Sequence, residues 1–180
     1  MKKSAQVLIR GFTLVELLIV IAIIAILAAV VVLIINPVEI TKRTRDATRL
    51  SDLTTLQNAI NVSVQEATGA SGYALYCNDP NATTDCTGTS NPAGAASQAI
   101  NGTGWVKINL SNQNSVQVPT LPVDPLNNSA FHYRYCGTTT GWKMLTRLES
   151  IKESGRMLTD GGSSNADYET GSVLSIACTY

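Results

Sequence analysis

Glu16 is a lone carboxylate at the start of the longest apolar run in the chain. Nineteen uncharged apolar residues, Leu17 to Ile35, follow it. A carboxylate in an apolar membrane segment costs about 2.5–3.5 kcal/mol on insertion scales, and less near a helix end, so it needs a partner. A basic stretch, a glycine and an aromatic residue precede it: Lys2, Lys3, Arg10, Gly11 and Phe12. The chemistry open to Glu16 is charge compensation or, in a generic anchored protein, hydration at the headgroup level.

The four cysteines can form two disulfides. All of them follow the apolar run, at Cys77, Cys86, Cys136 and Cys178. An even number without a C-x-x-C pair predicts disulfides in an oxidising compartment rather than a zinc site. Three pairings are possible. We favour Cys77–Cys86, a short loop, and Cys136–Cys178, which would tie the C-terminus to an earlier strand. Chain-entropy estimates give roughly 2.7 and about 4 kcal/mol for these two loops.

The other polar residues form no recognisable enzyme constellation. His132 is the only histidine, so there is no H-E-x-x-H motif, and a Ser–His–Asp triad is merely arithmetically possible. Walker and dinucleotide-binding glycine motifs are absent from the sequence. We therefore expect a protein that is not an enzyme and that holds neither a metal nor a cofactor.

The apolar run has the length of a membrane-spanning helix. At about 1.5 Å per residue, Leu17 to Ile35 covers roughly 28 Å, close to the ~30 Å hydrocarbon core of a bilayer. The basic N-terminus favours the cytoplasm for that end and the exterior for the rest of the chain. Basic residues that follow the run weaken this argument, and the cysteines restore it; these basic residues are Lys42, Arg43, Arg45 and Arg49.

The net charge does not indicate a nucleic-acid-binding protein. Thirteen basic and thirteen acidic residues balance over the whole chain. Three of the basic residues lie within residues 1–11, so ten bases remain against thirteen acids without that segment, a charge of about −3. A generally basic surface is therefore not predicted, and nucleic acid as a partner stays an open question.

The stretch GFTLVEL, from Gly11 to Leu17, resembles the N-terminal segment of type IV prepilins and type II secretion pseudopilins. In that family a membrane peptidase cuts a short basic leader after the glycine, and the new N-terminal residue is methylated. The resemblance implies cleavage after Gly11, N-methylation of Phe12 and an assembly role for Glu16. The new ammonium of Phe12 would meet the Glu16 carboxylate of a staggered neighbour, so that two groups costly to bury alone form one pair. Pairing within one chain is the alternative.

The segment after the run predicts a second stretch of helix. Pro37 should kink or locally melt the helix where the apolar run ends. Helical spacing then resumes up to about Gly69, with Arg45, Arg49 and Asp52 mostly off the apolar stripe. The stripe, which we expect to pack on a sheet, consists of Leu50, Leu53, Leu56, Ile60 and Val64.

The remaining residues predict a small antiparallel sheet and hence an α+β fold. Residues 69–104, rich in small and polar residues, predict a surface excursion held by the first disulfide. Strands are predicted at Trp105–Leu110, Val116–Val118, Phe131–Cys136, Trp142–Leu148 and Val173–Cys178. A long helix on such a sheet resembles the pilin fold, and LPVDPLNNSAFHYRY is similar to the turn that precedes the sheet in major pseudopilins and small pilins. The predicted domains are a leader at 1–11, a membrane or filament-core helix at 12–36, its amphipathic continuation at 37–68 and an extracellular β-rich domain at 69–180.

Several further residues could carry binding functions. Some pseudopilins bind calcium in a C-terminal loop, and Asp160, Asp167 and Glu169 surround a glycine-rich turn here. Their spacing does not match an EF-hand loop, so we favour a solvated loop. Aromatic residues could form an adhesive or DNA-contacting surface, although core positions are favoured: Tyr73, Tyr76, Trp105 and Tyr180. Asn-x-Ser/Thr triplets, which a host could glycosylate, occur at Asn61, Asn81, Asn101, Asn109 and Asn127.

The resemblance implies a structural subunit, the major pilin of a type IV pilus-like filament. Such a subunit is anchored in the cytoplasmic membrane, with its N-terminus in the cytoplasm, and reaches the cell surface on assembly. Its partners would be copies of itself, the membrane, a prepilin peptidase, and an assembly ATPase with its membrane platform. The alternatives are a pseudopilin of a type II secretion-like system and a membrane-tethered extracellular binding module.

Overall fold

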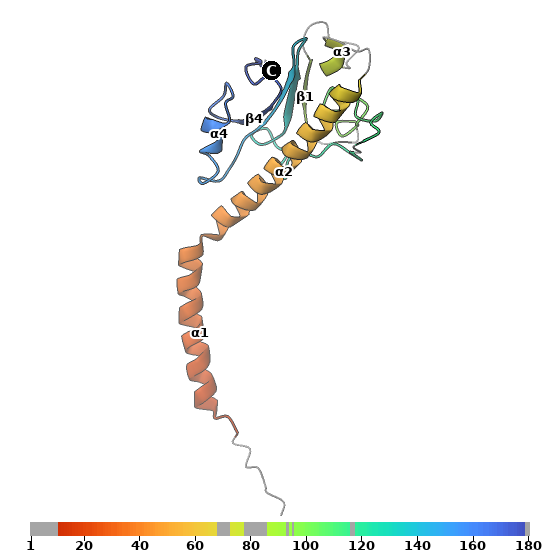
Figure 1. The fold of residues 1–180 in the computed structure, drawn as a ribbon. Coiled ribbons are helices and arrows are strands. Elements are labelled where there is room, and N and C mark those ends of the chain that lie inside the picture. The colour runs from red at the N-terminus through yellow and green to blue at the C-terminus, as the bar shows by residue number, and fades with distance from the viewer. Residues whose placement is uncertain are drawn as a thin grey trace, which may run out of the picture. The chain divides into compact units, whose positions relative to one another are not determined.

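The computed structural model forms two compact units, residues Met1–Ile40 and Thr41–Tyr180. It describes residues 11–67, 73–77, 86–92, 94, 96–115 and 118–178 (Figure 1). The second unit, which holds the sheet, is called the globular unit below.

The first unit is built on the helix α1, Leu14–Ile35. Thr13 caps its N-terminus, and the run of β-branched residues that follows is compatible with a helix in lipid, where the backbone must satisfy its own hydrogen bonds. α1 ends at Asn36, which adopts a left-handed conformation with φ of 45°. Pro37 then starts the helix α2, Pro37–Glu66. The interruption therefore lies at the predicted Asn36-Pro37 pair, because proline lacks an N–H group and suits the first position of a new helix.

The globular unit contains a four-stranded antiparallel sheet in the order β1-β2-β3-β4. The turn between β2 and β3 forms the predicted hairpin, in which Thr138 N donates to the carbonyl oxygen of Gly141 at 2.8 Å. The strands are β1 (Cys86–Thr89), β2 (Arg134–Gly137), β3 (Trp142–Thr146) and β4 (Tyr168–Gly171), and two short helices accompany them, α3 (Tyr73–Tyr76) and α4 (Arg156–Thr159).

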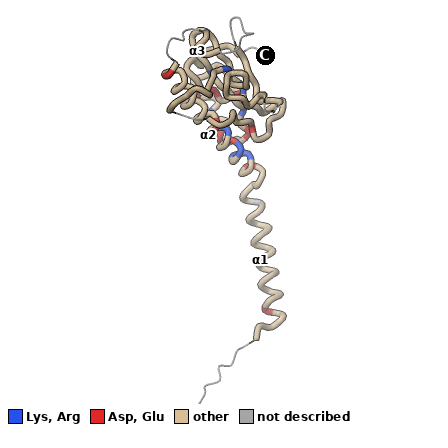
Figure 2. Tube along the Cα trace, turned by 90° about the vertical axis from the view of Figure 1, so that its right-hand side faces the viewer, with Lys and Arg blue, Asp and Glu red and all other residues tan. Residues whose placement is uncertain are grey.

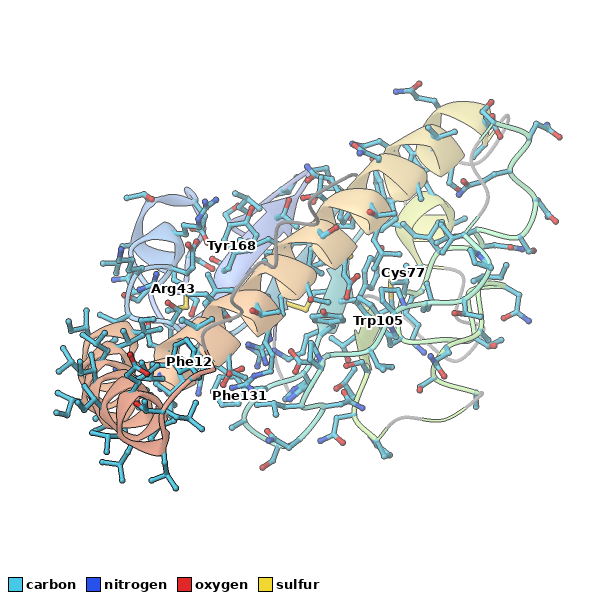
Figure 3. The ribbon with its side chains drawn as sticks, turned by 90° about the horizontal axis from the view of Figure 1, so that it is seen from below. Phe12, Arg43, Cys77, Trp105, Phe131 and Tyr168 are labelled. Atoms are coloured by element: carbon cyan, nitrogen blue, oxygen red, sulfur yellow. A yellow bond between two sulfur atoms is a disulfide. The ribbon has the colours of Figure 1, made fainter. Side chains whose placement is uncertain are left out.

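α2 packs on one face of this sheet. Its residues Leu53, Leu56 and Ile60 are fully or almost fully buried. Cys77 and Trp105 lie beside the C-terminal half of the helix (Figure 3). The sheet contributes Tyr135, Trp142 and Met144 to the same core cluster, and Tyr133, which immediately precedes β2, joins it. The predicted apolar stripe thus does face the sheet.

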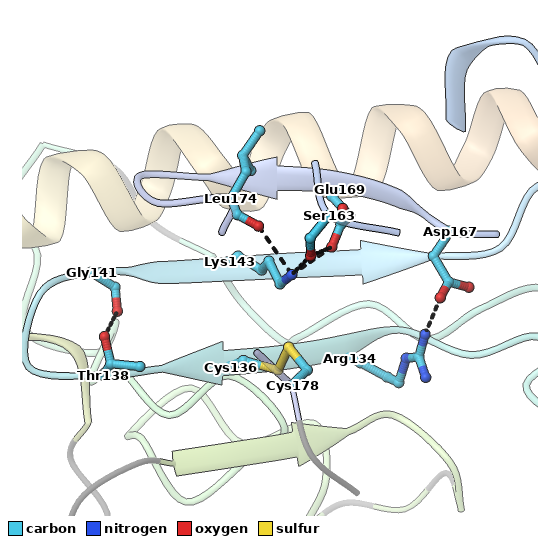
Figure 4. The surroundings of a disulfide bond; sticks show 10 residues. All are labelled: Arg134, Cys136, Thr138, Gly141, Lys143, Ser163, Asp167, Glu169, Leu174 and Cys178. Atoms are coloured by element: carbon cyan, nitrogen blue, oxygen red, sulfur yellow. Dashed lines mark hydrogen bonds and ion pairs between the residues drawn. A yellow bond between two sulfur atoms is a disulfide. The ribbon is translucent and has the colours of Figure 1, made fainter. Parts of the chain in front are cut away.

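The C-terminal segment covers the other face. Cys136, Leu145 and Ile176 form a second, smaller cluster there, with Val173 and Cys178 packed against it. Because β2 and β3 alternate their side chains between faces, Cys136 and Leu145 point away from α2. The Cys136–Cys178 disulfide joins the segment to β2 (Figure 4). The unit is therefore three layers deep, α+β in class, and consistent with the pilin fold.

Two predicted strands are wrong. Trp105–Leu110 is an irregular segment in which Trp105, Val106, Ile108 and Leu110 are all buried, and only Asn109 makes an isolated bridge, to Asn101. Val173–Cys178 lies across the sheet instead of extending its edge. Both runs have strand-like composition. The core surrounds Trp105–Leu110, so burial rather than backbone pairing accounts for its apolar residues, whereas Val173–Cys178 buries Ile176 alone and leaves Ser175 and Ala177 exposed. Residues 116–117 of the run Val116–Val118 lie outside the described residues.

Part of the segment 69–104, predicted to lie on the surface, is buried. It contains β1, whose Cys86 is buried and bonded to Cys77. Gly137 of β2 lies so close that a Cβ atom there would be 2.9 Å from both sulfur atoms. The disulfide therefore joins the residue after α3 to the edge strand β1, and the glycine in β2 leaves room for it. The predicted end of the helix near Gly69 lies outside the described residues.

Candidate assembly site

Glu16 forms a capping box with Thr13 at the start of α1. The carboxylate Oε2 accepts hydrogen bonds from Thr13 N at 2.9 Å and from Thr13 Oγ1 at 2.8 Å, and Glu16 N donates to Thr13 Oγ1 at 3.2 Å. This box satisfies backbone donors that a helix N-terminus otherwise leaves unpaired. The sequence analysis missed Thr13, although Thr-x-x-Glu before an apolar run is the signature of this motif.

α1 offers no other charge to its surroundings. Every described side chain of the helix is exposed, and Glu16 is its one acidic residue (Figure 2). Leu14–Val32 is the one helix in the described part of the chain that is long and apolar enough to cross a membrane. An apolar surface of this length needs lipid or other helices around it, because nothing within its own unit covers it.

Gly11 and Phe12, the predicted processing residues, stand clear of the folded elements. Phe12 is 79% exposed. A Cβ atom built on Gly11 would meet no other atom within 4 Å. The fold therefore does not require glycine at position 11, and a requirement for it would arise from an enzyme that acts on this peptide. The basic residues Lys2, Lys3 and Arg10 lie outside the described residues.

The globular unit buries a cluster of charges that the sequence analysis did not predict. Arg49 has no exposed side-chain surface and binds three carboxylates. Its Nε and Nη2 contact Asp124 at 2.6 and 2.9 Å, and its Nη1 contacts Asp46 at 2.8 Å and Glu149 at 2.6 Å. Arg45 adds a bidentate pair with Glu149 at 2.7 and 2.5 Å. We call these five residues the Arg49 cluster.

The Arg49 cluster joins α2 to two loops. Asp46 accepts hydrogen bonds from Glu149 N and Ser150 N, and Asp124 belongs to the turn before β2. Burial alone would lower the pKa of Arg49, but its hydrogen bonds to Asp124 and Glu149 raise that pKa further than burial lowers it. The pKa of Glu149 is lowered, chiefly by its hydrogen bond to Arg45. The prediction that Arg49 lies off the packed face of the helix is therefore wrong. The buried face of α2 includes this paired arginine as well as the leucines.

A second buried ion pair holds the acidic C-terminal loop. Lys143 Nζ contacts Glu169 Oε1 at 2.5 Å, Ser163 Oγ at 3.1 Å and the carbonyl oxygen of Leu174 at 3.1 Å (Figure 4). Asp160 instead accepts hydrogen bonds from Gly162 N and Glu169 N. The solvated loop predicted for these residues is therefore wrong for Glu169, which is 2% exposed.

Asp167 also departs from the solvated-loop prediction. It pairs with Arg134 at 2.7 Å (Figure 4). The described residues contain no group of three or more acidic, histidine or cysteine side chains that could hold a metal ion.

Asp52 and Tyr133 link α2 to the segment that immediately precedes β2. Tyr133 donates its hydroxyl hydrogen to Asp52 Oδ2 at 2.7 Å. Burial raises the pKa of the Asp52 carboxyl, and it also raises that of the Tyr133 hydroxyl, which the hydrogen bond to Asp52 raises further. The bond therefore joins a neutral hydroxyl to the side chain of Asp52, whose carboxyl group is a weaker acid than usual because it is buried.

The other predicted residues are distributed over the unit. The structure joins Cys77 to Cys86 and Cys136 to Cys178, the pairing favoured from the sequence. Trp105 is buried, and Tyr76 packs against the core. His132 Nδ1 lies 2.9 Å from the carbonyl oxygen of Asn128. Asn61 is exposed on α2, whereas Asn127 binds Ser90. Tyr180 and Asn81 lie outside the described residues.

Comparison with known protein families gives a match, and it covers the apolar N-terminal segment. Residues 9–32 match the family described as the prokaryotic N-terminal methylation motif. No curated protein and no solved structure matches the chain. The motif covers Gly11, Phe12, Thr13 and Glu16 together with most of α1. The chain therefore carries the N-terminal signature shared by type IV pilins and pseudopilins, which points to a structural protein rather than an enzyme.

Proposed function

We propose that this protein is the major structural subunit of a type IV pilus-like filament, assembled through α1. The observation that carries the proposal is an apolar helix that nothing in its unit covers, with one carboxylate, Glu16, at its N-terminal end. Such a helix suits two environments in turn: lipid before assembly and a bundle of identical helices afterwards.

Processing would complete the site. Cleavage after Gly11 makes Phe12 the first residue and gives it an ammonium group, which N-methylation leaves charged. Both Thr13 contacts use Oε2 of Glu16, so a second partner can approach Oε1. The ammonium of a neighbouring copy is the matching partner, and burying the two charges together avoids the cost of burying either one alone. One such pair at each subunit would fix how far each helix is staggered against the next.

The cell would supply the machinery around this site. A prepilin peptidase would cut and methylate the precursor, and an assembly ATPase with its membrane platform would lift subunits out of the bilayer. Before assembly α1 would span the cytoplasmic membrane with Phe12 on the cytoplasmic side. The globular unit would then lie outside, where an oxidising compartment permits both disulfides.

A fibre preparation tests the proposal. Filaments sheared from cells and examined by immuno-electron microscopy should be labelled along their whole length by an antibody to the globular unit. Mass spectrometry of the same material should find N-methylated Phe12 at the N-terminus. Unlabelled filaments, with loss of protein secretion when the gene is deleted, would identify a pseudopilin instead. A mature protein that begins after residue 35 would exclude both assignments.

A further inference from the structure

The exposed large apolar side chains of the globular unit are few and gather in two loops. Among the described residues from Thr41 onward they are Leu126 at 41%, Ile151 at 81% and Leu158 at 63% exposure. Two of the three come from the eight residues 151–158, which include most of α4. Exposed apolar side chains that lie together on a surface mark a site of contact with another surface more often than isolated ones do.

Both loops are fastened to the first turns of α2. Ser150 N, next to Ile151, donates to Asp46 Oδ2 at 2.7 Å. Leu126 N donates to Asp124 Oδ1 at 2.8 Å, and Asp124 in turn binds Arg49. The α4 segment and the part of α2 around Asp46 lie at the same end of the globular unit (Figure 1). This end is called the base below.

The base also carries a small excess of positive charge, because its arginines and lysines outnumber the carboxylates Asp46, Asp124, Glu149 and Glu153 that lie among them. Lys42 and Arg43 lie in the N-terminal part of α2. Several lysine and arginine positions lie close together along the trace of this part of the helix (Figure 2). Lys152 and Arg156 are exposed on either side of Gly155, and Arg156 also pairs with Glu153. Exposed aliphatic side chains among lysines and arginines are the combination that binds at the boundary of an anionic membrane.

The base lies close to the membrane span along the chain. α2 is one continuous helix, so Asp46 is about 14 Å along its axis from Pro37, at ~1.5 Å per residue. Pro37 follows the last residue of α1 by two positions. We propose that, in the unassembled subunit, the base docks on the anionic phospholipid surface of the membrane that α1 spans. The proposal rests on the proposed function, because it requires α1 to lie in a bilayer before assembly.

A fluorescent probe at the base tests this docking. The full chain carries no free cysteine among its described residues, so Leu158→Cys can be labelled with an environment-sensitive dye. One copy would be placed in nanodiscs of phosphatidylcholine alone, or of equal parts phosphatidylcholine and phosphatidylglycerol. We expect the dye to emit at shorter wavelength, and to be less accessible to iodide, only with phosphatidylglycerol. The matched control is Thr139→Cys, which is exposed in the β2–β3 turn at the other end of the strands.

Charge reversal tests the cause of the shift. Lys152→Glu combined with Arg156→Glu should abolish the change at position 158 in phosphatidylglycerol. An unchanged dye spectrum in anionic discs, or an equal shift at position 139, would overturn the proposal. A shift that requires two copies in one disc would overturn it as well and would assign the base to a contact between subunits. A dye at Ala28→Cys reports separately whether α1 lies in lipid, so failure of the proposed function would be recognised as such.

Discussion

α1 and the globular unit arrange their apolar and charged side chains in opposite ways. α1 exposes every described leucine, isoleucine and valine and carries a single carboxylate at its start. The globular unit buries two tryptophans, two tyrosines and many of its aliphatic residues, and it also buries Arg49, Lys143, Asp46 and Glu169. Each of these buried charges has an oppositely charged or hydrogen-bonding partner in the same unit.

The contrast shows which unit provides partners for its own side chains. The globular unit pairs its buried charges within itself. α1 lacks a partner for its apolar surface, and lipid or other copies must supply one. Changes in α1 should therefore alter assembly while the globular unit stays folded, and changes in the buried charges should do the reverse.

The largest effect is expected from Glu16→Ala. Breaking a buried ion pair from one side typically costs about 3–5 kcal/mol, and a filament meets this cost at every subunit. Sheared filament yield should therefore collapse while processed protein accumulates in the membrane. Glu16→Gln, which keeps the volume and the hydrogen bonds to Thr13, should assemble poorly too.

Glu39→Gln is the matched control for Glu16. It removes the same charge, from the first turn of α2 rather than from α1. Its filament yield should stay close to that of the native protein. Normal yields from both Glu16 variants would show that this carboxylate does not pair in the filament.

Arg49→Met should give the next largest effect, on stability instead of assembly. Three carboxylates around Arg49 would lose their shared cation, and breaking a buried pair in this way costs about 3–5 kcal/mol. Urea titration in detergent, followed by the fluorescence of the buried Trp105 and Trp142, measures the free energy of unfolding. Arg45→Met is the control: its side chain is 25% exposed, so the loss should be below about 1 kcal/mol. Equal losses would contradict a special role for Arg49.

The two disulfides should differ in what they contribute. The Cys136–Cys178 loop spans a separation of 42 residues and the Cys77–Cys86 loop one of 9. Replacing each pair by alanine should cost about 4 and about 2.7 kcal/mol by chain entropy. The same urea titration gives both values, and non-reducing peptide mapping of extracellular protein gives the pairing. Free thiols in that material would contradict both the pairing and the oxidising compartment.

The smallest expected effect is on the dependence of the unfolding free energy on pH in acid. Because the pKa of Glu149 is lowered in the fold, its contribution to stability is present above its ordinary pKa and is lost as the pH falls through the folded value. Glu149→Gln should therefore flatten the acid side of a plot of unfolding free energy against pH. Asp52→Asn should steepen it, since the raised pKa of Asp52 has the opposite sign. Parallel curves for the two variants would refute this assignment.

Periodicity and composition predicted the features set by local sequence. The apolar run, the break at Pro37, the buried stripe of Leu53, Leu56 and Ile60, and the α+β class all follow from patterns within a few residues of one another. GFTLVEL also marked the segment that the methylation motif covers.

Contacts between distant residues could not be predicted in this way. Arg49 meets Asp124 across 75 residues and Glu149 across 100, and no local spacing reveals such partners. An arginine on an amphipathic helix is ordinarily solvated, so only tertiary structure shows that it is buried. The run Trp105–Leu110 was misjudged for the same reason, since its burial on all sides depends on segments elsewhere in the chain.

The ion pair between Lys143 and Glu169 determines whether the acidic loop needs a metal ion from solution. The ammonium group of Lys143 supplies the cation for Glu169, and it is part of the same polypeptide. A tethered counter-ion is present in fixed one-to-one proportion, and dilution, chelation or exchange with the medium does not remove it. The order of this loop should therefore not depend on the concentration of metal ions in the surrounding solution.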